Sequence, residues 1–509
     1  MTTVAIPQTP PAPRPMAPAI AGRRAVAARA SADFTLYDIT VGTAVMSAVL
    51  LVNKFGLAGN IAFFVIIFAM LVRSPLNAYR ALTLGLLALC TNNALVVKTV
   101  LWAFARFGLV VGASGRFFLL DLTAGRRSLM HDGRYVCLCL FCGVASLTSL
   151  MAGNRPDLAL MKVFSFWFGL SGLFAATEVL RVTRQDVTAW TVKLIATTQV
   201  MCVLSLVLGI GQNYKHKAFA GKLFNLGFYH SQTLGPISAI MFLFLACVLL
   251  FTGYRNRWIC LPLMASLLYG LYMSGSRTGV VALVVGLSLI CGLALVWSQH
   301  RMFRLRLNFS RGTIVAMVIA GVIGVVFLDV GLGGRISRSA INFMAKSGRE
   351  VETVTFNQTL SSRKGLIDRA MANFWKSPLY GHGFQLYADR EANYDRTFLS
   401  AQVEKGFLPA AVLEETGVLG AFFLIVLCVS FLRHYYQTRN VPGLAMFVAF
   451  LVVNLGECIF FSLGGHGAFV WSFVMAGDLL GDRCRIAVAP RVVPLPGVPR
   501  PDLSSAVPA

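Results

Sequence analysis

The chain has 509 residues, of which 57% are hydrophobic, and its mean hydropathy is +0.70. A soluble protein of this length could not bury so much apolar surface, and continuous rather than alternating apolar runs argue against a membrane β-barrel. The net charge of +24 is not gathered in a basic soluble module, which makes nucleic acid a poor partner. The composition therefore predicts an all-α polytopic membrane protein with about 12–14 transmembrane helices.

The two ends of the chain differ from the rest in composition. Residues 1–35 are rich in Pro, Ala and Arg and lack the apolar centre of a signal peptide, and residues 483–509 are also rich in Pro. We expect both ends to be disordered cytoplasmic tails. Between them we predict transmembrane helices over 36–331 and 412–482, separated by a long loop over 332–411.

Apolar runs that approach the bilayer-spanning length of about 20 residues recur along the chain. They predict membrane-spanning helices at residues 38–53, 57–72, 81–98, 99–115, 135–151, 158–176, 193–211, 233–253, 258–274, 279–298, 313–331, 412–432, 442–462 and 465–480. Most of the 11 cysteines lie in or beside these runs, including those of "CLCLFC" at 137–142. This stretch lacks flanking His or acidic residues, so small apolar helix residues are a better interpretation than a metal site.

Short connections between the predicted helices carry much of the positive charge. The basic ones are residues 125–134, 181–186, 254–257, 301–311 and 433–439. Alternating the helices across the membrane places all of them on one face, together with both termini. Because Lys and Arg in short loops mark the cytoplasmic side, this common face is predicted to be cytoplasmic.

Three segments then share the opposite face. They are residues 211–236, the turn "SGSRTG" that holds Arg277, and the loop 332–411. A loop as long as the third is usually either functional or disordered. Trp375 and other aromatic residues give it side chains to pack. We therefore expect an ordered, mostly helical cap.

Arg277 lies where one predicted helix ends and the next begins. It could be a snorkelling arginine that anchors a helix end. Its position on the translocated side, where arginines in short loops are disfavoured, argues for an anion-binding role instead. The neighbouring Gly, Ser and Thr residues allow close approach of a ligand. A guanidinium near a helix start also matches phosphate oxygens bidentately.

Two other stretches on this face carry candidate residues. Segment 211–236 contains Lys222 and His230 and no acidic residue. It could be a random basic loop or a second wall of an anionic pocket, in which His230 would act as general base or phosphate donor. In the long loop, "SPLYGHGF" predicts a tight turn that exposes His382, either as a plain surface residue or as a ligand-binding group.

The stretch "VEKGFLPAAVLEETGVLG" leads back into the membrane. Glu414 and Glu415 fall at the start of its apolar helix, where acids suit the helix dipole but where intramembrane carboxylates also mark function. Glu404, just before this helix, is a candidate base. The sequence contains no P-loop, zinc-ligand spacing or serine-hydrolase elbow. Phosphate chemistry would therefore depend on Arg and Lys, and we expect no metal and no other cofactor.

Taken together, these stretches resemble the O-antigen ligase and polymerase superfamily. The resemblance is carried by "GFYHSQTLG", "SGSRTG", "SSRKGLIDRAMANFWKSPLYGHGF" and "LEETGVLG", which follow the family's order within residues 190–432. It implies a GT-C-like glycosyltransferase of the bacterial inner membrane with its active site facing the periplasm. Members take a glycan from an undecaprenyl-pyrophosphate carrier and invert the anomeric carbon, without a nucleotide sugar or a metal.

The resemblance also implies roles for single residues. Arg277 corresponds to the family's Ser-x-Arg arginine, which contacts the pyrophosphate, and His230 with Gln232 corresponds to a His-x-Asn pattern. The remaining matches are Lys222 for an upstream arginine, Arg363 with Gly381 and Gly383 for the loop's Arg and Gly-x-Gly, and Glu415 with Gly417 for Glu-x-Gly.

One place departs from the family pattern. The ligases usually have a His-Asn pair before the re-entering helix, whereas this chain has Glu404, Lys405 and Gly406. The departure favours a polymerase-like member in which a carboxylate takes the place of the histidine. We expect catalytic roles for Arg277, Glu404 and His230. We expect binding of pyrophosphate or glycan by Lys222, Gln232, Arg363, His382, Lys405 and Glu415.

The predicted reaction is polymerisation of lipid-linked oligosaccharide repeat units by transfer to an acceptor hydroxyl, and the alternative is ligation of the glycan to lipid A-core. Chain-length or export proteins are further candidate partners. A lipid-linked oligosaccharide flippase would instead show internal repeats and charges around a cavity at mid-membrane depth. A non-catalytic assembly partner would show basic groups that do not converge.

Overall fold

The computed structural model describes residues 35–91, 100–123, 128–152, 155–207, 214–215, 222–223, 231–254, 256–297, 303–305, 307–331, 356–389, 391–394, 405–462 and 465–487. Within these ranges a helix lies at every predicted span, and the protein is an all-α polytopic membrane protein as predicted. The two predicted tails fall outside the described residues except for residue 35 and residues 483–487. The latter end a helix and form a short strand, so order extends past the predicted start of the second tail, and the disorder of the remaining tail residues stays a prediction.

The helices that coincide with the predicted spans are α2 (Leu36–Val52), α3 (Gly56–Arg73), α4 (Pro75–Cys90), α5 (Val100–Thr123), α7 (Gly133–Ala152), α8 (Pro156–Val182), α9 (Thr188–Val207), α10 (Ser231–Phe251), α11 (Cys260–Ser274), α12 (Arg277–Trp297), α13 (Arg311–Gly331), α16 (Leu408–Gln437), α17 (Val441–Asn454) and α18 (His466–Cys484). The other helical elements of the described ranges are α6 (Ser128–His131), α15 (Phe356–Phe374), η1 (Arg257–Ile259) and η2 (Glu391–Asn393).

Among the described residues, 6 helices are long and apolar enough to cross a membrane: α3, α7, α8, α10, α12 and α16. The outer face of α3 shows what such a helix presents to lipid. Ile61, Val65, Phe68 and Val72 are exposed and recur at helical spacing along one side, while Phe63 on the other side is completely buried. An apolar outer face of this kind suits a hydrocarbon surrounding rather than water.

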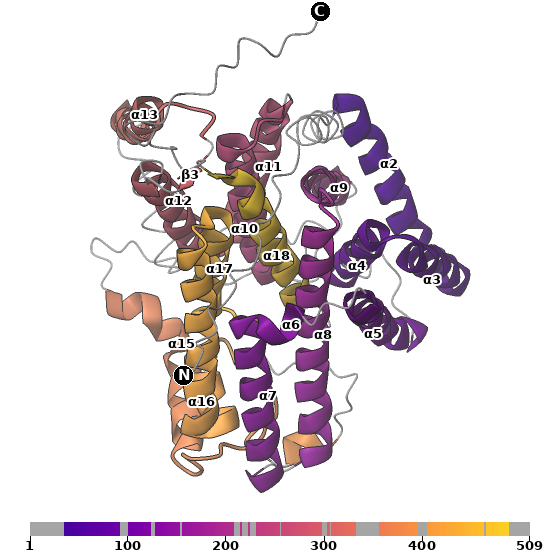
Figure 1. Ribbon diagram of the computed structural model, residues 1–509. Helices are drawn as coiled ribbons and strands as arrows, with labels where there is room; N and C mark the ends of the chain where they lie inside the picture. Colours follow the sequence, from indigo (N-terminus) through magenta and orange to yellow (C-terminus); the bar gives the residue numbers. More distant parts are fainter. Residues whose placement is uncertain are drawn as a thin grey trace, which may run out of the picture.

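Helix α10 lies at the centre of the bundle. Its segment Thr233–Phe251 is buried along its whole length, as expected for a helix that is apolar all round. It contacts α11, α12, α17 and α18. In Figure 1, α2 to α5 lie on one side of the molecule and α12 and α13 lie on the other, with α10 and α18 between them.

Contacts between distant segments gather the basic connections at one end of the bundle. Arg134 and Arg181 both pair with Asp478 of α18. Asp186 accepts a hydrogen bond from the Tyr254 hydroxyl and pairs with Arg483. The chain after α18 also forms a two-stranded antiparallel ladder with the connection before α13, between β3 (Phe303–Leu305) and β4 (Arg485–Ala487). The basic connections that were predicted to share one face therefore lie together at one end of the bundle.

A second short ladder lies in the basic segment 211–236. Strand β1 (Tyr214–Lys215) pairs antiparallel with β2 (Lys222–Leu223). Tyr214 lies opposite Leu223, and Lys215 lies opposite Lys222. Most of this segment is outside the described residues, so its role as the wall of a pocket stays a prediction.

Two helix boundaries differ from the prediction for identifiable reasons. Helix α4 begins at Pro75 rather than near 81, because the Ser74 side chain caps it by accepting the Asn77 N–H, and proline suits the first helical position. Helix α17 ends at Asn454 rather than near 462. There the side-chain oxygen of Asn454 accepts the N–H groups of Ile459 and Phe460 and turns the chain.

The long loop is only partly described. Its helix α15 packs against α16, and the described residues 375–389 and 391–394 follow it, the latter containing the short helix η2. Figure 1 shows α15 beside the start of α16, at the end of the molecule where α7 ends and α8 begins. Residues 332–355 and 395–404 lie outside the described ranges, so the extent of the predicted cap is not tested.

Candidate functional site

The turn around Arg277 is a tight connection between α11 and α12. Helix α11 ends at Ser274, and Gly275 then adopts a left-handed backbone with φ 63°, which favours glycine. Ser276 accepts the Gly279 N–H at 3.2 Å and so caps the start of α12. Arg277 is the first residue of α12 and its side chain is half-buried. The guanidinium therefore sits at the positive end of a helix dipole, as the sequence predicts.

Glycines of two neighbouring segments allow this turn to pack closely. A Cβ atom on Gly235 of α10 would overlap Ser276, and one on Gly456, just after α17, would overlap Thr278. The start of α10 and the connection after α17 are thus pressed against the turn on both sides. Gln232, one of the predicted binding residues, lies in the first turn of α10 together with Gly235. Its backbone therefore lies near Arg277.

The loop "GHG" at 381–383 docks on an interruption of α16. Gly417 has φ 64° and ψ −166°, a conformation open only to glycine in practice, and it breaks the helical hydrogen bonding there. Val418 donates its N–H to the Pro378 carbonyl instead of to Glu414. The carbonyl of Glu414 then accepts the His382 N–H at 3.0 Å, and that of Glu415 accepts the Gly383 N–H at 2.9 Å.

Close packing makes this junction intolerant of larger residues. A Cβ atom on Gly381 would overlap the backbone of Glu415, and one on Gly417 would overlap the Leu379 carbonyl. The Gly-x-Gly and Glu-x-Gly patterns singled out in the sequence are therefore two sides of one contact. Gly381 and Gly417 are needed because the two backbones approach closely there.

Next to this junction three charged side chains are buried together. The Lys405 ammonium lies 3.1 Å from Glu414 Oε2 and 3.4 Å from Glu415 Oε1. The other carboxylate oxygens also have partners. Glu414 Oε1 accepts from the Asn373 side-chain amide, and Glu415 Oε2 accepts the Gln385 N–H, both at 2.9 Å. The two glutamates lie two turns inside α16 rather than at its start, so the helix-dipole explanation does not account for them.

The solvent exposure of His382 differs from the prediction. The turn was expected to expose this residue, but its side chain is half-buried. Its ring Nε2 lies 2.9 Å from the Asn373 carbonyl. The exposure prediction was wrong because the two glycines close the loop onto α16 instead of presenting it to solvent. His382 thus ties the loop back to the end of α15.

A single short connection joins the Arg277 turn to the carboxylate cluster. Gly456 touches Thr278 beside Arg277, and five residues further along the chain the Phe461 carbonyl accepts the Gln385 side-chain amide at 3.1 Å. One end of the bundle therefore combines a guanidinium at a helix start with a set of buried carboxylates. The first suits an anionic group, and the second can fix the orientation of a nearby segment.

The other predicted residues are described less completely. His230 and Glu404 lie outside the described residues, so their catalytic roles stay predictions. Lys222 lies in β2, Gln232 in α10 and Arg363 in α15, but only their backbones are described. Lys405, Glu415 and His382 lie together around the junction of the loop with α16.

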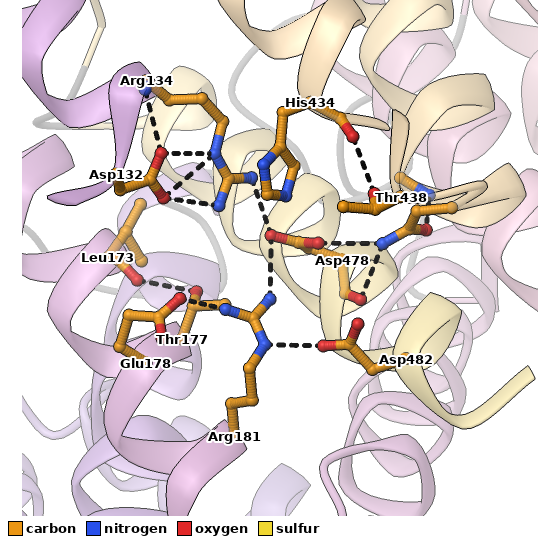
Figure 2. Close-up of polar contacts among 12 residues, drawn as sticks. Asp132, Arg134, Leu173, Thr177, Glu178, Arg181, His434, Thr438, Asp478 and Asp482 are labelled. Carbon is orange, nitrogen blue, oxygen red and sulfur yellow. Dashed lines mark hydrogen bonds and ion pairs between the residues drawn. The ribbon is translucent and has the colours of Figure 1, made fainter. Parts of the chain in front are cut away.

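A second charged cluster lies at the opposite end of these helices, and sequence reasoning missed it (Figure 2). Arg134 is only 1% exposed, and it pairs with Asp132 at 2.7 Å and with Asp478 at 2.8 Å. Arg181 pairs with Glu178, with Asp482 at 2.6 Å and with Asp478 at 3.3 Å. The acidic residues Glu178 and Asp478, set within apolar stretches, were the signal that could have revealed it.

Aromatic rings and an altered acidity complete this cluster. The guanidinium of Arg134 lies over the rings of Phe174, Phe431 and Tyr435, with centroid distances of 5.3–5.6 Å. Burial disfavours the charged form of Asp132, but hydrogen bonds from Arg134 and its positive charge outweigh burial and lower the pKa of Asp132 below its usual value. The cluster joins α7, α8, α16 and α18.

The sequence was compared with curated proteins and with models of protein families. No curated protein matches the chain. A family model described as O-Antigen ligase matches residues 262–425, which include the Arg277 turn, α15 and the buried glutamates of α16. The order of the matched elements agrees with the resemblance seen in the sequence motifs. Over this segment the chain is similar to the O-antigen ligase family, which supports the resemblance to the O-antigen ligase and polymerase superfamily.

Proposed function

We propose that this protein is an undecaprenyl-pyrophosphate-dependent glycosyltransferase that joins lipid-linked repeat units into a longer polysaccharide. The family match supports an enzyme of the O-antigen ligase and polymerase type. The observation that carries the finer proposal is the position of Arg277. It begins α12 in a turn of small residues, at the same end of the bundle as the junction of the long loop with α16.

Arg277 would act on the leaving group. A guanidinium can donate two parallel hydrogen bonds to phosphate oxygens, and the start of α12 adds its positive dipole end. During transfer, negative charge builds up on the pyrophosphate as its bond to the anomeric carbon breaks. A donor already in place for that charge lowers the barrier without reorganisation. The half-buried position of Arg277 makes such an interaction stronger than it would be in water.

The attacking group would be a hydroxyl of the acceptor glycan. Its oxygen forms the new bond to the anomeric carbon, its proton passes to a base, and undecaprenyl pyrophosphate departs from the opposite side, which inverts the centre. All four oxygens of Glu414 and Glu415 already have partners, so these glutamates suit a positioning role better than that of base. Glu404 remains the proposed base, because its neighbour Lys405 is fixed to α16.

We propose polymerase activity rather than ligation because the residues before the re-entering helix depart from the ligase pattern. The ligase pattern has a histidine before the re-entering helix, whereas here the following residue is a lysine that engages two buried glutamates. The proposed acceptor is therefore a second lipid-linked glycan rather than lipid A-core. The family match favours a transferase over a flippase.

The direct test is replacement of Arg277 in protein reconstituted with lipid-linked oligosaccharide. Arg277→Ala should abolish long chains without lowering membrane abundance, while Arg277→Lys, which keeps the charge but not the bidentate geometry, should retain a small residual activity. Normal chain length with Arg277→Ala would refute the proposal. Deletion with glycan profiling then separates the two reactions, since single attached repeats indicate a lost polymerase and unattached lipid-linked glycan indicates a lost ligase.

A further inference from the structure

The loop that docks on α16 is also held by helices outside the segment matched by the family model. Residues 384–389 and 391–393 of this loop include contacts to the end of α7 and to the residue before α8. The Phe384 N–H is donated to Ser149 Oγ of α7 at 3.1 Å. Arg155, just before α8, donates to the Asn393 carbonyl at 3.3 Å. The two ends of this stretch are thus attached to one hairpin of the N-terminal half.

Gln385 is the most constrained residue of the stretch. It has φ 57°, an unfavourable left-handed backbone for a residue with a side chain, and it is buried. Its N–H bonds to Glu415 Oε2, its side-chain amide bonds to the Phe461 carbonyl, and its own carbonyl accepts from Lys162 Nζ at 3.0 Å. Such a conformation persists only where the surroundings determine it, and it is often found where geometry matters for function.

Lys162 is an unusual choice for its position. It lies about two turns into α8 within a membrane-spanning segment, and it is only 7% exposed. Burying an ammonium group costs free energy that an apolar side chain would avoid. Lysines inside membrane segments therefore usually serve a function rather than stability. Its described hydrogen bond is directed at the strained residue of the loop.

These contacts form a continuous line from α8 to Lys405. Lys162 holds the Gln385 carbonyl, the Gln385 N–H orients the Glu415 carboxylate, and that carboxylate pairs with Lys405. Lys405 is the direct neighbour of Glu404 in the chain. Ser149 supports the same line from α7, because its completely buried hydroxyl accepts the N–H of the residue before Gln385.

We propose that Lys162, with Ser149 as its support, is a positioning residue for glycosyl transfer. It sets the backbone of Gln385, and through Gln385 it orients the Glu415 carboxylate that holds Lys405 beside the junction of the loop with α16. This inference rests on the function proposed above. It assigns a role in the reaction to α7 and α8, which the family match does not include.

The test replaces Lys162 by methionine, which keeps the length of the side chain and removes the donor. Lys162→Met should lower kcat by about 10- to 100-fold with little change in KM, because misplacing a catalytic group by a small distance has effects of this size. Lys162→Gln, which retains a shorter donor, should recover part of the rate. Lys193→Met is the matched control, since Lys193 also lies near the start of a membrane helix but packs on Gly42 of α2.

A second readout does not depend on activity. Hydrogen exchange of peptides covering residues 383–389 should become faster in Lys162→Met and stay unchanged in Lys193→Met, while Tm is similar for both. Unchanged exchange and unchanged kcat in Lys162→Met would refute the positioning role. If the wild-type protein forms no polymer, the proposed function fails, and the role in transfer fails with it. Faster exchange would then support only a structural attachment of the loop.

Discussion

The buried pair of Arg134 with Asp478 offers a strong test of what holds the helices together. Replacing Arg134 by alanine leaves the carboxylates of Asp132 and Asp478 in a buried place without their shared partner. Breaking one side of a buried ion pair generally costs about 3–5 kcal/mol. The Asp478 carboxylate keeps one hydrogen bond from the Asn440 side-chain amide at 2.8 Å and an ion pair with Arg181 at 3.3 Å, which reduces the loss at that carboxylate.

Two further effects of Arg134→Ala act in the same direction. The guanidinium packs on three aromatic rings, those of Phe174, Phe431 and Tyr435, and its removal leaves a cavity among them. Cavities in packed interiors add to the cost of losing the interaction itself. We therefore expect Arg134→Ala to lower the free energy of unfolding by about 3–5 kcal/mol. The lost contacts with the aromatic rings add to this cost, and the partners that Asp478 retains reduce it by a similar amount.

The assay is unfolding of the purified protein in a fixed detergent or nanodisc, followed by tryptophan fluorescence. Arg155→Ala is the matched control, because Arg155 also pairs with an aspartate two positions away in the sequence, yet its partner Asp157 is 63% exposed. Exposed ion pairs add little stability, so the control should unfold close to the wild type. If Arg134→Ala unfolds like Arg155→Ala, the cluster does not stabilise the bundle and the reasoning is refuted.

Two other predictions concern the loop junction and the acidity of the cluster. Gly417→Ala should lower Tm and accelerate exchange at 378–383, because a Cβ would overlap the Leu379 carbonyl; Gly143→Ala, which meets no atom, should do neither. The lowered pKa of Asp132 means that its stabilisation is present above the unfolded value of 3.8 and is lost as pH falls through the folded value. The Tm advantage of wild type over Asp132→Asn should therefore be constant from about pH 7 to 5, begin to shrink near the unfolded value of 3.8, and disappear only as pH falls through the lower folded value; a difference that stays constant into strong acid would contradict the shift.

The helices were predictable because hydropathy is a local property of the chain. Each apolar run of the sequence coincides with a helix, and the positions of basic connections correctly grouped segments that lie at one end. Boundaries were displaced where a single side chain decides the ending, as at Ser74 and Asn454. Hydropathy averages over such residues, whereas a capping hydrogen bond depends on one of them.

The site was predictable only in part, for a related reason. Arg277 could be singled out because its charge contradicts its predicted side of the membrane. Contacts such as Arg134 with Asp478 and Lys162 with Gln385 join residues that are 344 and 223 positions apart, and no local pattern reports such a pair. For His382 the residue type was noticed, but its environment depends on the break at Gly417 in another helix.

The described contacts attach the N-terminal half of the protein to the proposed site. In Figure 1, α7, α8 and α16 lie side by side, and each of them is attached to its neighbours at both ends. At one end Arg134 and Arg181 join them through α18, and at the other the loop carrying Gln385 joins Ser149, Lys162 and Glu415. Three helices fixed at both ends cannot tilt independently. The loop geometry is therefore set by the whole frame, although the family match begins only at residue 262.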